Sequence, residues 1–417
     1  MLIALEHPLK VDKAATALLT GVICWVLVIY GKDTLFGPDV NISYVEESIT
    51  FRLGEISAIL FFLLAAMTIV ELIDAYHGFE VVTSKIRTTS RVNLLWIVCL
   101  TTFFFSAVLD NLTTTIVIAA LLKKLIDDRE ELWFFAGMVV ISANAGGAWS
   151  PIGDITTIML WIGGQITAMN IIKQAFLPSL ICLIVPLIVV SFQSKGDIGR
   201  PVEDDTEGIK KIPRGRSNLI LLVGVLGLLF VLFFKNLTHL PPFMGMLFSL
   251  GSIWVLTEIM NREESERRRA SLSVSAMITK IDTPSVLFFL GILLAVSSIQ
   301  TAGHLRLLAV LMDDSFSSLY IINGIIGLLS ALVDNVPLVA GAMGMYSMET
   351  YPQDHVFWEL LAYCAGTGGS ALIIGSAAGV AIKGILKIDF VWYFKKMSWL
   401  AILGYFSGFL VFYLFNG

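Results

Sequence analysis

The sequence predicts an all-α polytopic membrane protein, and three observations lead to that fold class. Hydrophobic residues make up 56% of the 417 residues and charged residues only 15%, whereas about a quarter of the residues of a soluble protein are charged. Apolar segments recur along the whole chain, and about 20 apolar residues are enough to cross a bilayer. The polar pair Asp110-Asn111 stands inside one apolar segment and returns as Asp334-Asn335 inside another. We therefore expect a helical membrane protein made of two related halves.

Apolar segments that are candidates for membrane helices alternate with links that contain charged residues, proline or glycine. The link 193–217 is rich in glycine and proline, which is typical of a flexible joint. The link 260–282 contains NREESERRR, which predicts a solvated surface helix. The candidate segments are 13–30, 53–75, 93–122, 132–162, 171–192, 218–235, 243–259, 284–302, 318–346, 356–386 and 390–415.

The distribution of Lys and Arg predicts which segments cross the membrane, because loops rich in these residues stay on the cytoplasmic side. The links 76–92 and 123–131 are both basic, yet one long apolar segment separates them. A single crossing would leave one of these links on the wrong side. Residues 93–126 are therefore expected to form a re-entrant hairpin that opens to the cytoplasm. Acidic flanks predict that 318–346 forms a hairpin that opens to the outside.

Further matches extend the similarity between the two halves. Residues 61–78 can be laid over 288–305, and AGGAWSPIGD at 145–154 over TGGSALIIGS at 367–376. An odd number of crossings separates matching segments, which predicts two inverted repeats, a design found in many secondary transporters. The first repeat is expected to lack its initial helix, because no partner of the first helix of the second half precedes Leu5. The expected parts are the first repeat 1–192 (hairpin 93–126, broken helix 132–165), a cytoplasmic linker 193–217 and the second repeat 218–417 (hairpin 318–346, broken helix 356–386).

The repeated Asp-Asn pairs predict a site for cations and protons. An ionised aspartate at membrane depth is costly unless a cation, hydrogen bonds or water stabilises it. A low dielectric disfavours the charged carboxylate, so a proton and a metal cation compete for it. Such competition at an alternately exposed site is sufficient for exchange. A structural alternative is that each Asp caps the second helix of its hairpin. We expect Na+ at Asp110, Asn111, Asp334 and Asn335.

Two glycine-rich stretches, 143–154 and 366–379, interrupt long apolar segments and predict broken helices. Glycine relaxes the backbone and Pro151 lacks an amide hydrogen. A broken membrane helix frees carbonyl oxygens, which is tolerated only beside protein or a water-filled cavity. Such carbonyls suit a small hard cation such as Na+. Close helix packing is the alternative reason for the glycines. The side chains expected to add oxygens are those of Asn111, Thr113, Asn144 and Asn335.

Other ionisable residues in apolar segments are candidates for the same pathway. Asp154 follows a helix break, where it is expected either to contact the cation directly or to act through a neighbouring residue. Glu71 and Asp74 near the cytoplasmic end of their helix, and Glu55 near its outer end, fit either a proton path or ordinary interfacial charges. The four cysteines lack zinc-ligand spacing and are interpreted as packing residues. The sequence has no stripe of basic residues interleaved with aromatic residues, which is the pattern that would indicate nucleic-acid binding.

At these motifs the sequence closely resembles NhaD-type sodium/proton antiporters of the ion transporter superfamily. The stretches LDNLTTTIVIAALLKKL and ISANAGGAWSPIGDITTIMLWIGGQ carry the resemblance, which extends over nearly the whole chain. It implies two inverted repeats, each with a re-entrant hairpin and a broken helix, commonly in a homodimer, here in a bacterial inner membrane. It also implies exchange of Na+, and of Li+, for H+, with no cofactor.

The resemblance further implies a lining set of residues for each half. The second half departs from the first in having Pro337 in place of Thr113 and Ser376 in place of Asp154. We therefore expect the two sites to differ in occupancy. The first set is Asp110, Asn111, Thr113, Ser106, Asn144 and Asp154, and the second is Asp334, Asn335, Ser330, Thr367 and Ser370.

A sodium-coupled di- or tricarboxylate symporter on the same scaffold is the main alternative. Two carboxylates at the hairpin tips would repel an anionic substrate, and neither glycine-rich stretch contains Lys or Arg to hold one. A membrane aspartyl protease is a second alternative. Each Asp is paired with Asn in a repeated hairpin, however, and no membrane GxGD motif occurs. A channel does not explain the paired carboxylates. We therefore expect a secondary transporter rather than an enzyme.

Overall fold

The computed structural model describes residues 13–37, 41–80, 88–193, 196–199, 212–316 and 318–417. Within these ranges every regular element is a helix, apart from an isolated bridge between Ser90 and Asp197. Eight of the described helices are long and apolar enough to cross a membrane, which confirms the predicted all-α polytopic membrane fold. They are α2 (Lys13–Tyr30), α4 (Ile42–Ala75), α6 (Arg91–Leu109), α10 (Ala168–Gln193), α11 (Arg214–Thr238), α12 (Pro242–Met260), α15 (Thr283–Thr301) and α22 (Ser398–Asn416).

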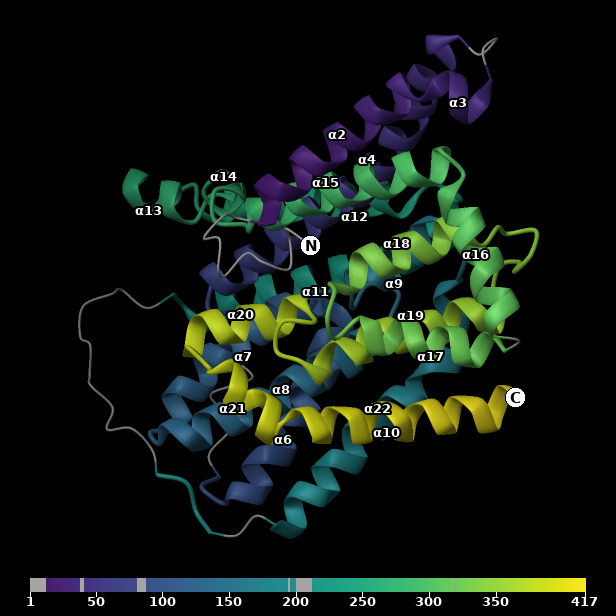
Figure 1. Cartoon of the computed structure of the whole chain (residues 1–417). Helices are drawn as coiled ribbons and strands as arrows, with labels where there is room; N and C mark the ends of the chain where they lie inside the picture. The colour runs from purple at the N-terminus through teal and green to yellow at the C-terminus, as the bar shows by residue number, and fades with distance from the viewer. Residues whose placement is uncertain (1–12, 38–40, 81–87, 194–195, 200–211, 317) are drawn as a thin grey trace.

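Shorter helices lie between these spans and at the edges of the molecule (Figure 1). Four interrupted elements matter for the site, because in each of them a short non-helical stretch separates helices in the middle of an apolar segment. The hairpins are α6 with α7 (Asn111–Leu125) and α17 (Leu319–Leu329) with α18 (Asn335–Met345). The broken helices are α8 (Arg129–Ala148) with α9 (Ile155–Ile162), and α19 (Val356–Gly368) with η2 (Gly369–Ala371) and α20 (Ala377–Leu386). The remaining helices are α3 (Lys32–Phe36), α13 (Glu266–Ser271), α14 (Val274–Ile278), α16 (His304–Ser315) and α21 (Phe390–Lys396).

The long helices pack in layers that mix the two halves of the chain. In Figure 1, α2 from the first half lies along α15 from the second, and α10 lies along α22. Close approach explains the glycines at the first of these crossings: a Cβ built on Gly21 would lie 2.7 Å from the carbonyl oxygen of Gly291. Two large clusters of buried apolar side chains surround the broken helices on either side. The polar centre is therefore enclosed by hydrocarbon side chains.

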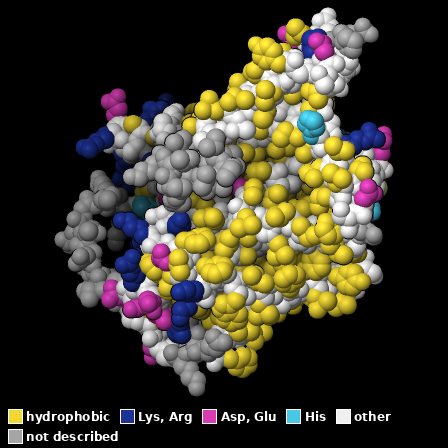
Figure 2. All heavy atoms as spheres, in the orientation of Figure 1, with side chains coloured by type: hydrophobic (Ala, Val, Ile, Leu, Met, Phe, Trp, Pro, Cys, Tyr) yellow, Lys and Arg dark blue, Asp and Glu magenta, His cyan; other side chains and the backbone are white. Residues whose placement is uncertain are grey.

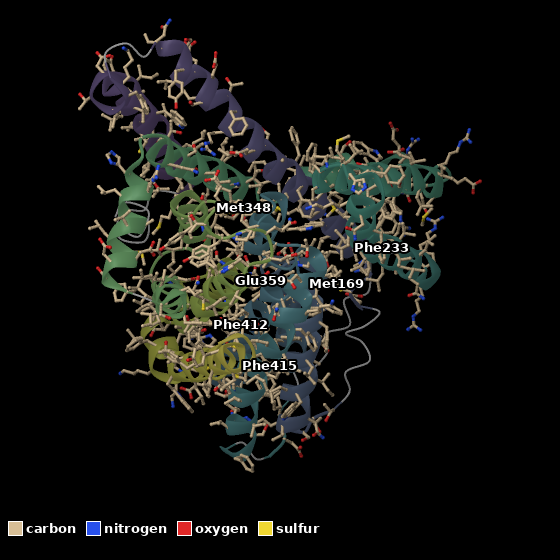
Figure 3. All side chains as sticks on the ribbon, turned by 90° about the vertical axis from the view of Figure 1, so that its right-hand side faces the viewer. Met169, Phe233, Met348, Glu359, Phe412 and Phe415 are labelled. Carbon is tan, nitrogen blue, oxygen red and sulfur yellow. The ribbon has the colours of Figure 1, made fainter. Side chains whose placement is uncertain are left out.

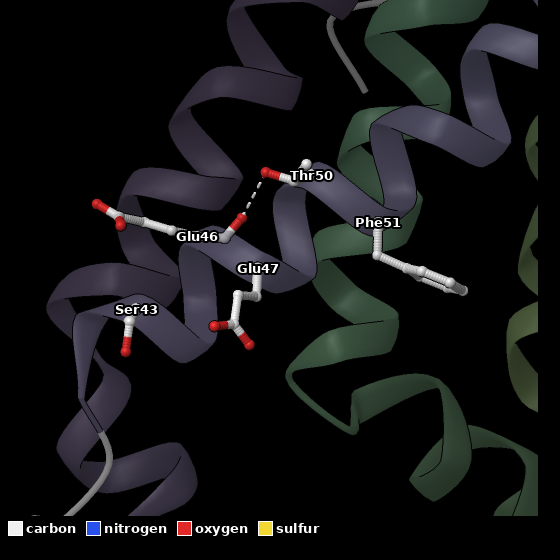
Figure 4. Close-up of a pocket in the computed structure, with 5 residues that line it drawn as sticks. All are labelled: Ser43, Glu46, Glu47, Thr50 and Phe51. Atoms are coloured by element: carbon white, nitrogen blue, oxygen red, sulfur yellow. Dashed lines mark hydrogen bonds between the residues drawn. The ribbon is translucent and has the colours of Figure 1, made fainter.

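One predicted boundary is shifted in the structure. The helix expected at 53–75 begins at Ile42, and its first turns extend away from the body beside α2 and α3 (Figure 1). No proline interrupts 42–75, and the helix continues through this stretch without a break. Figure 4 shows this exposed stretch, where Glu46 and Glu47 point away from the helix.

Charged side chains mark the two ends of the molecule. Figure 2 shows Lys and Arg gathered mainly at the left, with a broad band of apolar side chains across the middle. This arrangement fits the predicted basic cytoplasmic side. The link 260–282 forms the short helices α13 and α14, as expected of a solvated surface segment.

Several expectations about the repeats stay predictions. Most of the linker 193–217 lies outside the described residues, as do residues 1–12, next to which a missing first helix was expected. The two hairpins and the two broken helices occur in the same order in each half. The inverted orientation of the halves stays a prediction.

Candidate functional site

The two hairpin tips carry the repeated aspartates as helix N-caps. Asp110 alone separates α6 from α7, and its carboxylate accepts the Thr113 amide at 2.8 Å and the Thr113 hydroxyl at 2.9 Å. Asp334 caps α18 by accepting the amide of Val336 at 3.2 Å. Both aspartates are partly exposed rather than fully buried. The structural alternative raised by the sequence is thus present, and capping still leaves carboxylate oxygen lone pairs for a cation.

The broken helices bring a third aspartate to the centre. Asp154 caps α9 through a capping box with Thr157, and its Oδ1 accepts the amide of Thr156 at 3.0 Å. Its side chain is only 1% exposed. In the other half the matching position is Ser376, which caps α20 by accepting the amide of Gly379 at 3.2 Å. The two helix breaks therefore use equivalent caps, but only one of them carries a carboxylate.

The Asp154 carboxylate joins the two hairpin tips. The Nδ2 of Asn111 donates to Asp154 Oδ2 at 2.9 Å. The Nδ2 of Asn335 donates to the same oxygen at 3.2 Å and to Oδ1 at 3.4 Å. Both asparagines are buried, and they lie in different halves of the chain. A single acidic group thus holds both tips through neutral amide donors.

Asn144, in α8, extends this network to the second broken helix. Its Oδ1 accepts the Asn111 Nδ2 at 3.2 Å. Its own Nδ2 donates to the hydroxyl oxygens of Ser370 at 2.9 Å and Ser376 at 2.8 Å. The network therefore reaches all four interrupted elements, and it is made of one carboxylate, amides and hydroxyls.

Matched contacts hold each hairpin against its broken helix. Ser106 donates to the carbonyl oxygen of Ala143 at 2.5 Å, and Ser330 donates to that of Ala365 at 2.7 Å. In both halves a glycine also brings the backbones together. A Cβ on Gly146 would overlap the Phe103 carbonyl oxygen, and a Cβ on Gly368 would overlap that of Gly327. These equivalent contacts support the repeat inferred from the sequence.

The structure brings together only some of the residues singled out in the sequence. The hydroxyl of Thr367 donates to the carbonyl of Tyr363 in its own helix at 2.6 Å. Glu55 is exposed and pairs with Arg52 at 3.0 Å. Glu71 is partly buried near the end of α4, where Asp74 and Lys280 influence it electrostatically. The residues that meet at the centre are Asn111, Asn144, Asp154, Asn335 and Ser370.

Two polar residues of interest were not predicted from the sequence. Ser376 was noted only as a departure from Asp154, whereas the structure makes it a direct partner of Asn144. Glu359 is fully buried in α19, although it stands near the start of an apolar segment where a charge is usually interfacial. An acidic residue flanked by apolar neighbours, as in VFWELLAY, was the available signal.

The central network could hold a small cation mainly through neutral oxygens. Among the described residues, no three His, Cys, Asp or Glu side chains form a group able to hold a metal ion. Asp110 lies close enough to Asp154 for the two carboxylates to interact electrostatically, and so does Asp334. A monovalent cation near Asp154 would therefore combine carboxylate, amide and hydroxyl oxygens, which suits a hard ion.

Interrupted helices that meet around a buried polar centre, within a set of apolar spans, define this chain as a membrane transporter. Comparison with known proteins gives the family. Residues 1–366 match the family model described as "Citrate transporter" (CitMHS), so the chain belongs to this family and is a transporter rather than an enzyme.

Similar proteins of known name refine this placement. The chain is 47% identical to sodium/proton antiporter 1 of Arabidopsis thaliana over 407 residues, which is 97% of this chain and 69% of that protein. It is 44% identical to sodium/proton antiporter 2 of the same plant over 415 residues, 99% of this chain and 96% of that protein. It is 27% identical to the Na(+)/H(+) antiporter NhaD of Vibrio cholerae over 441 residues, 100% of this chain and 89% of that protein. The resemblance to NhaD-type antiporters is confirmed.

Proposed function

We propose that this protein exchanges Na+ for H+ across its membrane. The observation that carries the proposal is the buried Asp154 carboxylate, which accepts amide hydrogens from Asn111 and Asn335 at the two hairpin tips. The names of the relatives, sodium/proton antiporters of Arabidopsis thaliana and NhaD of Vibrio cholerae, support it. The transported ions are small inorganic cations, Na+ and also Li+, in exchange for protons.

Competition for the carboxylates is the proposed mechanism. A charged carboxylate in a low dielectric needs a compensating proton or cation, and the amides around Asp154 are neutral. Rotation of the amides of Asn111 and Asn335 would turn their oxygens toward an arriving Na+. The Na+ would then displace the proton from Asp154. Asp110 and Asp334, with Thr113, lie at the tips where the ion would enter from either side. Alternating exposure of the centre to the two solutions would then couple Na+ movement to H+ movement.

The remaining expectations are part of the same proposal. The chain is an integral membrane protein, and we propose that it acts as a homodimer. A bacterial inner membrane or a plant membrane houses it, since relatives of both origins match nearly the whole chain.

A sodium-coupled carboxylate symporter is the second candidate, and the description of the matching family as "Citrate transporter" favours it. The site argues against it. The hairpin tips carry two aspartates, a third lies between them, and neither 143–154 nor 366–379 contains Lys or Arg. A di- or tricarboxylate would therefore meet negative charge with no fixed cation to bind it.

Everted membrane vesicles test the proposal. Added Na+, and added Li+, should dissipate a preformed pH gradient in vesicles that contain the wild-type protein. Asp154→Asn should abolish this response, because an amide cannot release a proton, and Asp110→Asn and Asp334→Asn should severely weaken it. Glu47→Gln, on the exposed start of α4, should behave as the wild type.

The same assay separates the alternatives. Dissipation that requires added citrate or succinate would favour the symporter. Full activity of Asp154→Asn, at equal amounts of protein in the membrane, would contradict the mechanism.

A further inference from the structure

A second buried carboxyl lies outside the central network. Glu359 belongs to the first turn of α19 and is 0% exposed. Figure 3 shows it near the middle of the molecule, seen from the end at the right of Figure 1. The predicted topology places this end on the outer side, because the acidic stretch METYPQDH (348–355) precedes α19.

The two oxygens of Glu359 have different surroundings. Its Oε1 accepts the Nδ2 of Asn170 at 2.6 Å. Its Oε2 is buried, and no hydrogen-bond donor among the described residues reaches it. An ionised carboxylate normally accepts several hydrogen bonds, and a buried charge without them is strongly destabilised. The local structure therefore suits the neutral, protonated acid better than the carboxylate.

Little nearby charge offsets this burial. Among the described residues of the helices packed most closely against α19, the charged ones are Arg129, Glu130 and Glu131 in the first turn of α8 and the exposed Lys173 of α10. Asp354 is negative and adds repulsion, although Lys235 interacts with it electrostatically. His355, the N-cap of α19, has a pKa held below its ordinary value by burial, so its imidazole is neutral at neutral pH. The helix N-terminus favours negative charge, but this effect is small beside the cost of burying a charge.

The surroundings of Glu359 are built by unusual backbone. Asp354 has a φ of +62°, a left-handed conformation that is uncommon for a residue with a side chain. In this conformation its carboxylate accepts the amide of Thr167 at 2.6 Å and the Thr167 hydroxyl at 2.8 Å. Asn170, on the first turns of the adjacent α10, also approaches the Asp354 carbonyl oxygen at 3.5 Å. Strained residues of this kind concentrate at functional sites.

Two helices connect this cluster to the central network. The α19 face that carries Glu359 also carries Gly366, seven residues or two turns later. A Cβ on Gly366 would lie 3.7 Å from Asp154 Oδ2, so this face runs directly to the central carboxylate. Seven residues span about 10 Å along a helix. Similarly, α9 begins at its cap Asp154 and leads to Thr167 beside Asp354.

The first half has no counterpart of Glu359. The offset that relates Ser376 to Asp154 places Gly137 at the equivalent position in α8. A Cβ on Gly137 would collide with the side chain of Met397. Among the described residues, a buried acid outside the central network therefore occurs only in the second half.

We propose that Glu359 is a second proton-binding carboxyl, which passes protons between the outer solution and Asp154 during exchange. This inference rests on the function proposed above. The Glu359 carboxyl releases its proton to water on the outer side and becomes a carboxylate. When a cation displaces the proton of Asp154, bridging water carries that proton to the Glu359 carboxylate, which is thereby protonated again.

Infrared spectroscopy tests the protonation directly, with or without transport. Purified wild-type protein in lipid at neutral pH should show the carbonyl stretch of a protonated carboxylic acid that disappears in Glu359→Gln. Glu349→Gln, which alters an exposed acid of the preceding loop, should leave this band in place. Absence of the band from the wild type would overturn the proposal, even if the protein exchanges Na+ for H+.

Transport tests the relay. Glu359→Gln should lower the Na+-dependent exchange rate about tenfold or more, as expected when a positioned proton donor is lost, and should flatten its pH profile. Glu359→Asp should restore part of both, and Glu349→Gln should match the wild type. A Glu359→Gln protein that has a lowered melting temperature but a wild-type pH profile would show that the residue is only structural and would overturn the proposal. If the wild type shows no exchange, the proposed function fails while the infrared result still stands.

Discussion

Asp110 combines a strained backbone with a carboxylate that caps α7. Its φ is +73° and its ψ is 161°, a region that is essentially restricted to glycine and costs about 1–3 kcal/mol for other residues. Glycine would fit this conformation better. An aspartate in its place is expected if the side chain itself is needed at the hairpin tip, as the proposed function requires.

Replacing Asp110 with glycine separates stability from function. Asp110→Gly removes the strain, while a glycine N-cap loses only a few tenths of a kcal/mol relative to Asp. We expect the melting temperature of the purified 417-residue protein to rise by about 1 °C, since about 1 kcal/mol is gained, and exchange to be lost.

Asp334→Gly is the matched control for this prediction. Asp334 has a φ of −45° and caps its helix without strain. Its replacement should therefore give no stabilisation. Equal melting temperatures for the two glycine variants would contradict the assignment of strain to Asp110.

At the scale of elements, backbone contact between hairpins and broken helices shapes the site. Gly146 of α8 lies against the carbonyl of Phe103 in α6 so closely that no Cβ fits. This contact, with the bond from Ser106 to Ala143, keeps the tip of the hairpin near Asn144. The position of Asn111 in the network thus depends on two helices that touch along their backbones.

Gly146→Ala tests this dependence. An alanine in a helix is normally favourable over glycine by about 1 kcal/mol, but overpacking here should cost about 1–3 kcal/mol because the contact is with backbone. We expect a lower melting temperature and weaker Na+-dependent exchange. Gly251→Ala in α12, where no atom lies within 4 Å of the new Cβ, should be neutral or stabilising. If the Gly146→Ala protein is as stable as the Gly251→Ala protein, α6 and α8 can move apart without loss of stability, which would contradict this prediction.

The elements themselves were largely predictable from the sequence. Glycine-rich stretches predicted interruptions where α8 ends before α9 and where α19 ends before α20. Basic links on both sides of 93–126 predicted a re-entrant hairpin, and the course of this segment through the membrane stays a prediction. The start of α4 was missed because 42–52 is polar enough to resemble a loop, whereas a helix continues through it. Helix continuity depends on hydrogen bonds that hydropathy does not report.

At the scale of the whole molecule, the centre joins residues that are far apart in the chain. Asn335 bonds to Asp154 and Asn144 bonds to Ser376 across the two halves. The sequence identified most of these residues but could not pair them, because pairing follows from how the halves pack. The same reason hid Glu359, whose burial comes from α10 and the loop before α19.

This arrangement makes one carboxylate common to both hairpins. Movement of either tip would change the hydrogen bonds of Asp154, so the proposed cation site and the conformation of both halves would be linked through it. The central claim is that H+ and Na+ cannot occupy this carboxylate together.

Calorimetric titration of Na+ into the purified protein, in buffers of different ionisation enthalpy, measures that competition most directly. The wild type should release protons as Na+ binds, and the buffer-dependent heat should vanish in Asp154→Asn. Na+ binding without proton release by the wild type, or unchanged proton release by Asp154→Asn, would contradict the claim.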